Sequence, residues 1–227
     1  MISIDWQAFL LTARLALITS MILMVIGLPL AWWLARASFR GASLIEALLA
    51  LPLVLPPTVL GFYLLIFLGP NSPVGGVYER LTGSLLPFSF PGLVVASVIS
   101  SLPFAVQPFL SGFRSVDTRL LDASLSLGAN RLKTFLQIAL PLAWPGLLAG
   151  FVLSFAHTLG EFGVVLMVGG NIPGVTRTVS ISIYDSVQAM DYSAAGWTSA
   201  LLVCISCSIL IFTYTLQKRL IQPWPGT

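Results

Sequence analysis

The chain has 227 residues, of which 57% are hydrophobic and only 8% are charged. About a quarter of the residues in an ordinary soluble domain are charged, so this composition excludes such a domain. The apolar residues form long continuous runs, which indicates an all-α integral membrane protein and excludes a barrel of short alternating strands.

The length suits a single membrane domain over residues 1–227 and leaves no room for a separate nucleotide-binding domain. The sequence contains no G-x-x-x-x-G-K-[ST] phosphate loop, so we expect no ATP hydrolysis by that route. The net charge of +3 does not indicate a nucleic-acid partner, and none is expected. In a membrane protein, the placement of Lys and Arg is more informative than their sum.

Five apolar stretches are long enough to cross a membrane as helices, which need about 20 residues. The predicted spans cover residues 9–35, 44–68, 92–113, 142–168 and 196–216. Two polar loops, 69–91 and 169–195, separate some of them. The second loop is expected to be partly helical and to lie on or re-enter the membrane, which leaves a sixth short membrane element open.

The basic residues predict the orientation, because Lys and Arg collect on the cytoplasmic side. With the amino terminus outside, eight basic residues lie in the cytoplasm: Arg36, Arg40, Arg114, Arg119, Arg131, Lys133, Lys218 and Arg219. Arg80 and Arg177 then lie outside. Arg14 falls within the first span, where its side chain either pairs with an acid or extends to the lipid headgroups. We therefore expect an external amino terminus and a cytoplasmic carboxyl terminus.

The second predicted span contains the proline-rich stretch LPLVLPPTVLGF. Proline has no N–H to donate, so this stretch interrupts the hydrogen bonds of a helix. Such a break is tolerated at membrane depth where neighbouring protein or a water-filled path satisfies the freed groups. Two interpretations of this break are possible, a structural kink and a translocation pathway. The pathway candidates here are Pro56, Pro57, Thr58 and Gly61.

The fourth predicted span carries His157 and Glu161, which are four residues apart and could share one helix face. Ionisable residues within a span are functional candidates, so a metal site or a proton relay is one interpretation. We favour a structural hydrogen bond to another helix or loop, and we expect no metal site because a lone pair lacks the further ligands that zinc needs. The pathway candidates in this region are Gly160, Glu161, Gly163 and Asn171.

Residues 115–141 form the longest charged and weakly apolar segment, SVDTRLLDASLSLGANRLKTFLQIALP. Its spacing predicts an amphipathic helix that Ser115 or Asp117 caps, followed by a turn at Gly128 with positive φ. Asn130 is expected to cap a second short helix over 131–138, which Pro141 closes. The exposed apolar stripe of the first helix predicts a partner in water, and the predicted topology places this segment in the cytoplasm.

The stretch DASLSLGANRLKTFLQIALP resembles the cytoplasmic coupling motif of ATP-binding-cassette importer permeases. The residues that match or accompany this motif are Asp122, Ala123, Gly128, Arg131, Ile138, Leu140 and Pro141. Asp122 stands where Glu is more usual, and Ser124 replaces a second Ala. The resemblance implies a short helix that inserts into a groove of a separate ATPase subunit. It also implies that ATP and magnesium bind to that ATPase, with no cofactor on this chain.

Two further stretches, LPLVLPPTVLGFYLL and SFAHTLGEFGVVLMVGGNIPGVTRT, resemble the permease family for molybdate, sulfate and tungstate. This resemblance implies a type I importer domain of the bacterial inner membrane that carries molybdate and is not itself an enzyme. Sulfate, thiosulfate or tungstate is the alternative substrate. The implied partners are a second copy of the chain, two ATPase subunits, an extracytoplasmic oxyanion-binding protein and membrane lipid. A distant alternative is a stand-alone carrier or enzyme that uses His157 and Glu161.

Overall fold

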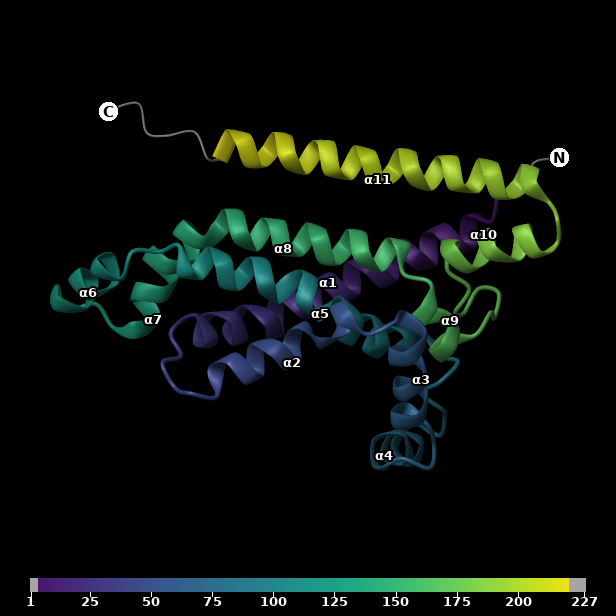
Figure 1. Cartoon of the computed structure of the whole chain (residues 1–227), viewed down its shortest axis with the longest axis horizontal. Helices are drawn as coiled ribbons and strands as arrows, with labels where there is room; N and C mark the ends of the chain where they lie inside the picture. The colour runs from purple at the N-terminus through teal and green to yellow at the C-terminus, as the bar shows by residue number, and fades with distance from the viewer. Residues whose placement is uncertain (1–3, 221–227) are drawn as a thin grey trace.

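The structure, a computed structural model, describes residues 4–220, and over that range it contains helices and no strand (Figure 1). The elements are α1 (Trp6–Ala35), α2 (Ala42–Val54), α3 (Pro57–Leu68), α4 (Pro73–Thr82), α5 (Phe90–Arg114), α6 (Thr118–Ser126), α7 (Arg131–Thr134), a π-helical turn (Phe135–Ala139), α8 (Leu140–Gly160), α9 (Gly163–Gly169), α10 (Val179–Gln188) and α11 (Tyr192–Leu220).

The centre of the bundle consists of α1, α5 and α8, which pack against one another along their length. Phe109 of α5 is fully buried between the other two helices, and its ring contacts the positions of Gly27 and Gly150. A Cβ added to Gly146 of α8 would lie only 2.8 Å from the Cα of Gly112 in α5. Small residues at this crossing therefore let the two backbones approach closely, as in many membrane helix pairs.

The number of apolar spans agrees with the sequence. Four helical stretches are long and apolar enough to cross a membrane: Trp6–Ala35, Phe90–Arg114, Arg131–Gly160 and Tyr192–Thr213. The pair α2 and α3 can count as a fifth, although the two helices bend by 110° at their junction. The expected break at the prolines is thus present, but 44–68 is not one straight helix. Leu55 is extended, as expected for a residue that precedes a proline.

The fourth span differs from the prediction at both ends. It stops at Gly160 instead of continuing to residue 168, because Glu161 has an extended backbone and a separate helix, α9, follows. At its start, α7, the π-helical turn and α8 run on without a break, so the prediction that Pro141 closes the second short helix is wrong. Leu140 donates its N–H to the carbonyl of Phe135, five residues back. This wider turn accommodates the proline within a continuing helix.

The two predicted loops contain helices of their own. The first, 69–91, holds α4, and the second, 169–195, holds α10, so the expectation of a partly helical second loop is confirmed. The last helix, α11, begins at Tyr192, four residues before the predicted start, and contacts α10 and α8. The α6–α7 segment lies at one end of the molecule, and α9 and α10 lie at the other (Figure 1).

Candidate functional site

Local hydrogen bonds fix the shape of the α6–α7 segment. The Asp117 side chain accepts the N–H of Arg119 at 2.9 Å, whereas Ser115 donates its hydroxyl to the Gly112 carbonyl, so Asp117 and not Ser115 caps α6. Gly128 has φ +83°, as the sequence predicts. Asn130 caps α7 by accepting the N–H of Lys133 at 2.8 Å. The turn between the two helices therefore follows from residues close together in the sequence.

A cavity of about 430 Å³ lies between α6 and the helix that begins with α7. It brings together three residues of the predicted coupling motif, Ala123, Gly128 and Ile138. The hydroxyls of Ser124 and Thr134 lie 3.0 Å apart and join α6 to α7 beneath it. The lining combines the exposed polar side chains of Lys133 and Gln137 with apolar ones, of which Leu127 is 89% exposed. This chain leaves that surface uncovered.

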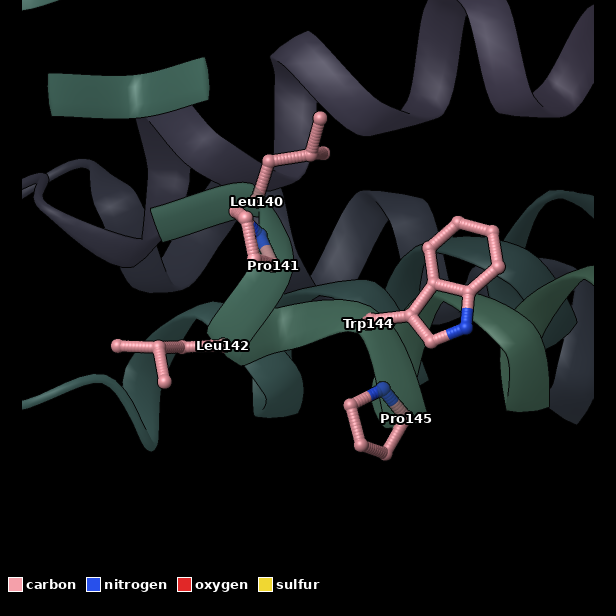
Figure 2. Close-up of a pocket in the computed structure, with 5 residues that line it drawn as sticks. All are labelled: Leu140, Pro141, Leu142, Trp144 and Pro145. Atoms are coloured by element: carbon pink, nitrogen blue, oxygen red, sulfur yellow. The ribbon is translucent and has the colours of Figure 1, made fainter. Parts of the chain in front are cut away.

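Other members of the predicted coupling motif lie outside this cavity. Leu140 and Pro141 stand at the start of α8, where they line a separate open hollow of about 520 Å³ with Leu142, Trp144 and Pro145 (Figure 2). Arg131 is exposed at the start of α7. The motif therefore covers two adjacent surfaces of the same end of the molecule.

Asp122, also exposed, lies close enough to Arg36 to affect the pKa of its guanidinium. Burial lowers the pKa of Arg36, and the Asp122 carboxylate opposes that change. Arg36 follows the last residue of α1 and lies over the Trp32 ring, 3.3 Å from its centroid. The Arg36 contact therefore lies within the end of α1, and Asp122 of α6 acts on Arg36 through its charge.

A second cavity, of about 530 Å³, lies where α8 gives way to α9. Five predicted pathway candidates line it: Pro57, Thr58, Gly160, Glu161 and Gly163. The structure thus brings the break in the second span next to the break after the fourth. Ala156, His157 and Phe162 complete the lining.

Glu161 and His157 together connect four helices at this cavity. One carboxylate oxygen accepts the N–H of Val164 in α9 at 3.1 Å, and the other lies 3.3 Å from His157 Nε2 in α8. The Glu161 carbonyl accepts the hydroxyl of Ser180 in α10 at 3.0 Å. His157 Nδ1 in turn lies 3.0 Å from the hydroxyl of Ser101 in α5. These contacts join α5, α8, α9 and α10 in one hydrogen-bond network.

The His157 ring stacks on Phe104, with ring centroids 3.9 Å apart. The Ser101 hydroxyl also lies 2.9 Å from that of Thr158. Within residues 4–220, no third His, Cys, Asp or Glu joins His157 and Glu161 in a group that could hold a metal ion. Ser101 and Phe104 were not singled out by the sequence, because both lie on another helix and carry no local motif.

The remaining pathway candidates lie elsewhere. Gly61 packs against α9, where an added Cβ would come within 2.8 Å of Met167. Pro56 caps α3 behind the cavity lining. Asn171 belongs to a polar cluster in the loop before α10, in which it accepts a hydrogen bond from Arg177 at 2.7 Å and donates one to Asp185. Arg177 also lies 3.5 Å from Asp185 and 4.0 Å from Asp5.

Comparison with known proteins places this geometry in a family. Residues 27–223 match the model of the family described as "Binding-protein-dependent transport system inner membrane component". The molybdenum transport system permease protein ModB of Azotobacter vinelandii is 49% identical over 214 residues, which cover 94% of this chain and 95% of that protein. Its namesake in Escherichia coli strain K12 is 36% identical, covering 97% of this chain and 93% of that protein. The sulfate transport system permease protein CysT of Salmonella typhimurium is 34% identical, with coverages of 93% and 76%.

Solved structures share the fold. A chain of the MetNI methionine ABC transporter in an inward-facing conformation superposes with a TM-score of 0.75 at 16% identity, covering 96% of this chain and 97% of that chain. A bacterial alginate ABC transporter gives a TM-score of 0.72 at 16% identity, with coverages of 95% and 80%. The predicted class, a multi-pass membrane permease component rather than an enzyme, is confirmed. The chain belongs to the family of inner membrane components of binding-protein-dependent transport systems.

Proposed function

We propose that this chain is the membrane-spanning permease subunit of an ATP-driven importer and that it carries molybdate across the bacterial cytoplasmic membrane. The observation that supports molybdate as the substrate is the 49% identity to a molybdenum permease over almost the full length of both chains. Three sulfate permeases among the relatives are 30–34% identical, and the match covers 76–80% of their own length. Sulfate and tungstate remain the alternatives, since all three ions are tetrahedral divalent oxyanions.

The test is uptake of labelled molybdate into vesicles that contain the complete transporter and its binding protein. We expect uptake to require ATP inside and the binding protein outside. Unlabelled molybdate and tungstate should compete, and sulfate should compete only in large excess. If sulfate competes as well as molybdate, the substrate assignment is wrong while the importer assignment stands. If uptake continues without ATP or the binding protein, the importer assignment itself fails.

We infer that the α6–α7 segment docks on the ATPase. The segment presents exposed leucines, Leu120 and Leu127, at a cavity of mixed polar and apolar lining, and exposed apolar side chains of this kind can anchor an interface by filling pockets on a partner. The sequence contains no G-x-x-x-x-G-K-[ST] phosphate loop, and we propose that hydrolysis takes place on another subunit and reaches the membrane helices mechanically. The continuous helix from α7 through α8 supplies a rigid connection from this segment to the bundle centre.

The assembly that we propose contains two copies of the chain, two ATPase subunits and an extracytoplasmic binding protein. The α6–α7 segment then faces the cytoplasm, and the Asn171–Arg177–Asp185 cluster faces the outside. The orientation is tested by placing a single cysteine at Ser126, in a chain whose Cys204 and Cys207 are replaced by alanine. A membrane-impermeant thiol reagent should label this cysteine only after the cytoplasmic face is exposed. Labelling of intact cells would contradict the orientation.

The cavity at the α8–α9 break is our proposed part of the translocation pathway. Neither Lys nor Arg is among the residues that line it, and Thr58 supplies a hydroxyl donor, whereas Val59 and Leu60 in the first turn of α3 already donate their N–H groups to the Pro56 carbonyl. Weak donors suit a permease, because a strong anion site would slow release of the ion. Replacing Thr58 with valine should lower the maximal rate of molybdate uptake with little change in ATPase binding. An unchanged rate would remove this cavity from the pathway.

A further inference from the structure

Arg14 lies on an outward-facing part of α1, about two turns after the helix begins at Trp6. Its guanidinium carbon lies 4.7 Å from the centroid of the ring of Phe90, which is the first residue of α5. Side chains on a helix lean toward the helix amino terminus. The guanidinium is therefore carried back from the apolar part of α1 to the end of the bundle, at the level where α5 begins.

The charge of Arg14 has no acidic partner within the described residues 4–220, where the ion pairs join other residues. The nearest acid in sequence, Asp5, accepts the N–H of Ala8 at 3.0 Å and lies 4.0 Å from Arg177. Arg177 is itself shared with Asp185. An arginine near the hydrocarbon boundary is costly unless something pairs with it. Any counter-ion for Arg14 therefore comes from outside that part of the chain.

A cavity of about 360 Å³ opens beside this guanidinium. Arg14 lines this cavity together with Gln7 of α1 and Phe90 of α5. Gly174 and Val175, from the loop before α10, also line it. Gln7 is exposed and can offer its amide N–H groups to a bound oxygen. The cavity thus combines one unpaired cation and one amide at the end of the membrane bundle, which are donors suited to a phosphate group.

An exposed apolar stripe runs along α1 from this cavity. Leu10, Leu17, Met21 and Val25 are between 47% and 74% exposed. Their spacing of seven, four and four residues places them on the same helix face as Arg14. A second protein chain could cover the stripe, but a purely apolar cover would leave the Arg14 charge unpaired. A lipid molecule supplies an apolar chain for the stripe and an anion for the guanidinium together.

We propose that this end of α1 is a binding site for the phosphate headgroup of an anionic membrane lipid. Arg14 and Gln7 hold the headgroup phosphate, and an acyl chain lies along Leu17, Met21 and Val25. A basic residue near a membrane surface contributes about 1 kcal/mol to the attraction of an anionic lipid. This corresponds to a preference of about fivefold for a lipid with net negative charge over a zwitterionic one.

The test uses the purified full-length chain in mixed micelles with equimolar phosphatidylglycerol and phosphatidylcholine, and native mass spectrometry counts the lipids retained. It requires no transport activity, so it is independent of the proposed substrate. The wild-type chain should retain phosphatidylglycerol about fivefold over phosphatidylcholine. The variant Arg14→Gln should lose this preference, whereas Arg80→Gln, which removes an exposed arginine from α4, should keep it.

A second variant tests the same site if Arg14→Gln folds poorly. Gln7→Leu leaves the charge in place and should reduce the preference only in part, with helix content unchanged by circular dichroism. A millimolar excess of inorganic phosphate should not displace the lipid, because free phosphate gains nothing from the apolar stripe. Equal retention of the two lipids by the wild-type chain overturns the proposal. So does an unchanged preference in Arg14→Gln, equal loss in Arg80→Gln, or displacement by inorganic phosphate.

Discussion

The two ends of α8 differ in both geometry and surface, because the helix continues through a π-helical turn at its start and stops at Glu161 at its end. At its start, the π-helical turn leads from α6 and α7, where leucine side chains face outward around an open cavity. At its end, Glu161 is only 7% exposed, and its oxygens are paired with groups from α8, α9 and α10. The first end leaves apolar surface to be covered, whereas the second satisfies its polar groups within the chain.

This difference separates a surface that binds another protein from a junction that holds the chain together. Uncovered leucines contribute little to the stability of an isolated chain, but they can contribute much to a complex. Paired buried polar groups do the reverse, because removal of one partner leaves the other unsatisfied. Substitutions at the first end should therefore change ATPase association with little effect on unfolding, and substitutions at the second end should change unfolding first.

The largest effect is expected at Leu127. Replacing Leu127 with aspartate puts a charge where the proposed ATPase groove is apolar, and loss of an interface anchor costs about 2–4 kcal/mol. The affinity of the chain for its ATPase, measured by titration in detergent, should fall by about 30-fold or more. The free energy of unfolding should change by less than about 0.5 kcal/mol, because the side chain is 89% exposed.

The matched control for Leu127 is Leu81→Asp, since Leu81 is also a strongly exposed leucine, at 80%, but lies on α4 away from the α6–α7 segment. It should leave ATPase affinity unchanged. Equal losses in the two variants would mean that the α6–α7 surface is not the docking surface.

At the other end of α8, Glu161→Ala should chiefly affect stability. The variant removes the acceptor for the Val164 N–H and the partner of His157, and each unsatisfied buried group costs about 1–3 kcal/mol. We expect a loss of about 3 kcal/mol in the free energy of unfolding by chemical denaturation in micelles. Glu161→Gln keeps an acceptor oxygen for Val164, and it should lose about 1 kcal/mol.

The exposed Glu79 on α4 supplies the comparison for Glu161, and Glu79→Ala should change the free energy of unfolding by less than about 0.5 kcal/mol. If Glu161→Ala is as stable as Glu79→Ala, the network at the α8–α9 break does not hold these helices together. Full loss of uptake in Glu161→Gln with normal stability would instead favour a direct role in transport.

The turn between α6 and α7 allows a test in which a variant and its control carry similar backbone strain. Gly128 and Gly83 both have positive φ, +83° and +70°, and an added Cβ meets nothing within 4 Å at either position. Isoleucine at either site should cost a similar amount, about 1–3 kcal/mol of local backbone strain. Only Gly128→Ile distorts the proposed docking segment, so it alone should lower ATPase affinity, by about tenfold.

Uptake into vesicles should fall in parallel with affinity for Gly128→Ile and stay near normal for Gly83→Ile. Normal uptake and ATPase association in Gly128→Ile would show that the segment does not couple the two subunits. Equal loss in both glycine variants would point to general misfolding instead.

Much of the fold follows from local properties of the sequence. The length of an apolar run decides whether it can span a membrane, and the spans of α1, α5 and α11 lie close to their predicted positions. Capping is also local, so Asp117, Gly128 and Asn130 occupy the predicted positions. The end of the fourth span was mispredicted because Val164–Val168 is as apolar as the helix before it. The break lies at Glu161, which contacts His157 and Val164 nearby in the sequence and Ser180 of α10 farther away.

The candidate site depends more on distance in space. The sequence indicates that Pro57 and Gly163 are special, but only the structure brings them into contact, with an added Cβ on Gly163 lying 2.7 Å from Pro57. Asn171 belongs to a different cluster, although its motif is adjacent in sequence to the α8–α9 break. Ser101 carries no signal at all, because a serine within an apolar helix gives no indication of the histidine opposite it.

The smallest effect is expected at that serine. Ser101→Ala removes the hydroxyl that lies near both His157 and Thr158 across the α5–α8 interface. Thr158 keeps its bond to the Ser154 carbonyl, so only part of the network is lost. Interhelical hydrogen bonds in membrane proteins contribute about 0.6 kcal/mol on average, and we expect a loss of about that size. Ser100→Ala is the control, because buried Ser100 donates only to the Ser97 carbonyl of its own helix. Unfolding in micelles should show Ser101→Ala as the less stable variant, and equal stability would mean that the bond across to α8 adds nothing beyond the packing of His157 on Phe104.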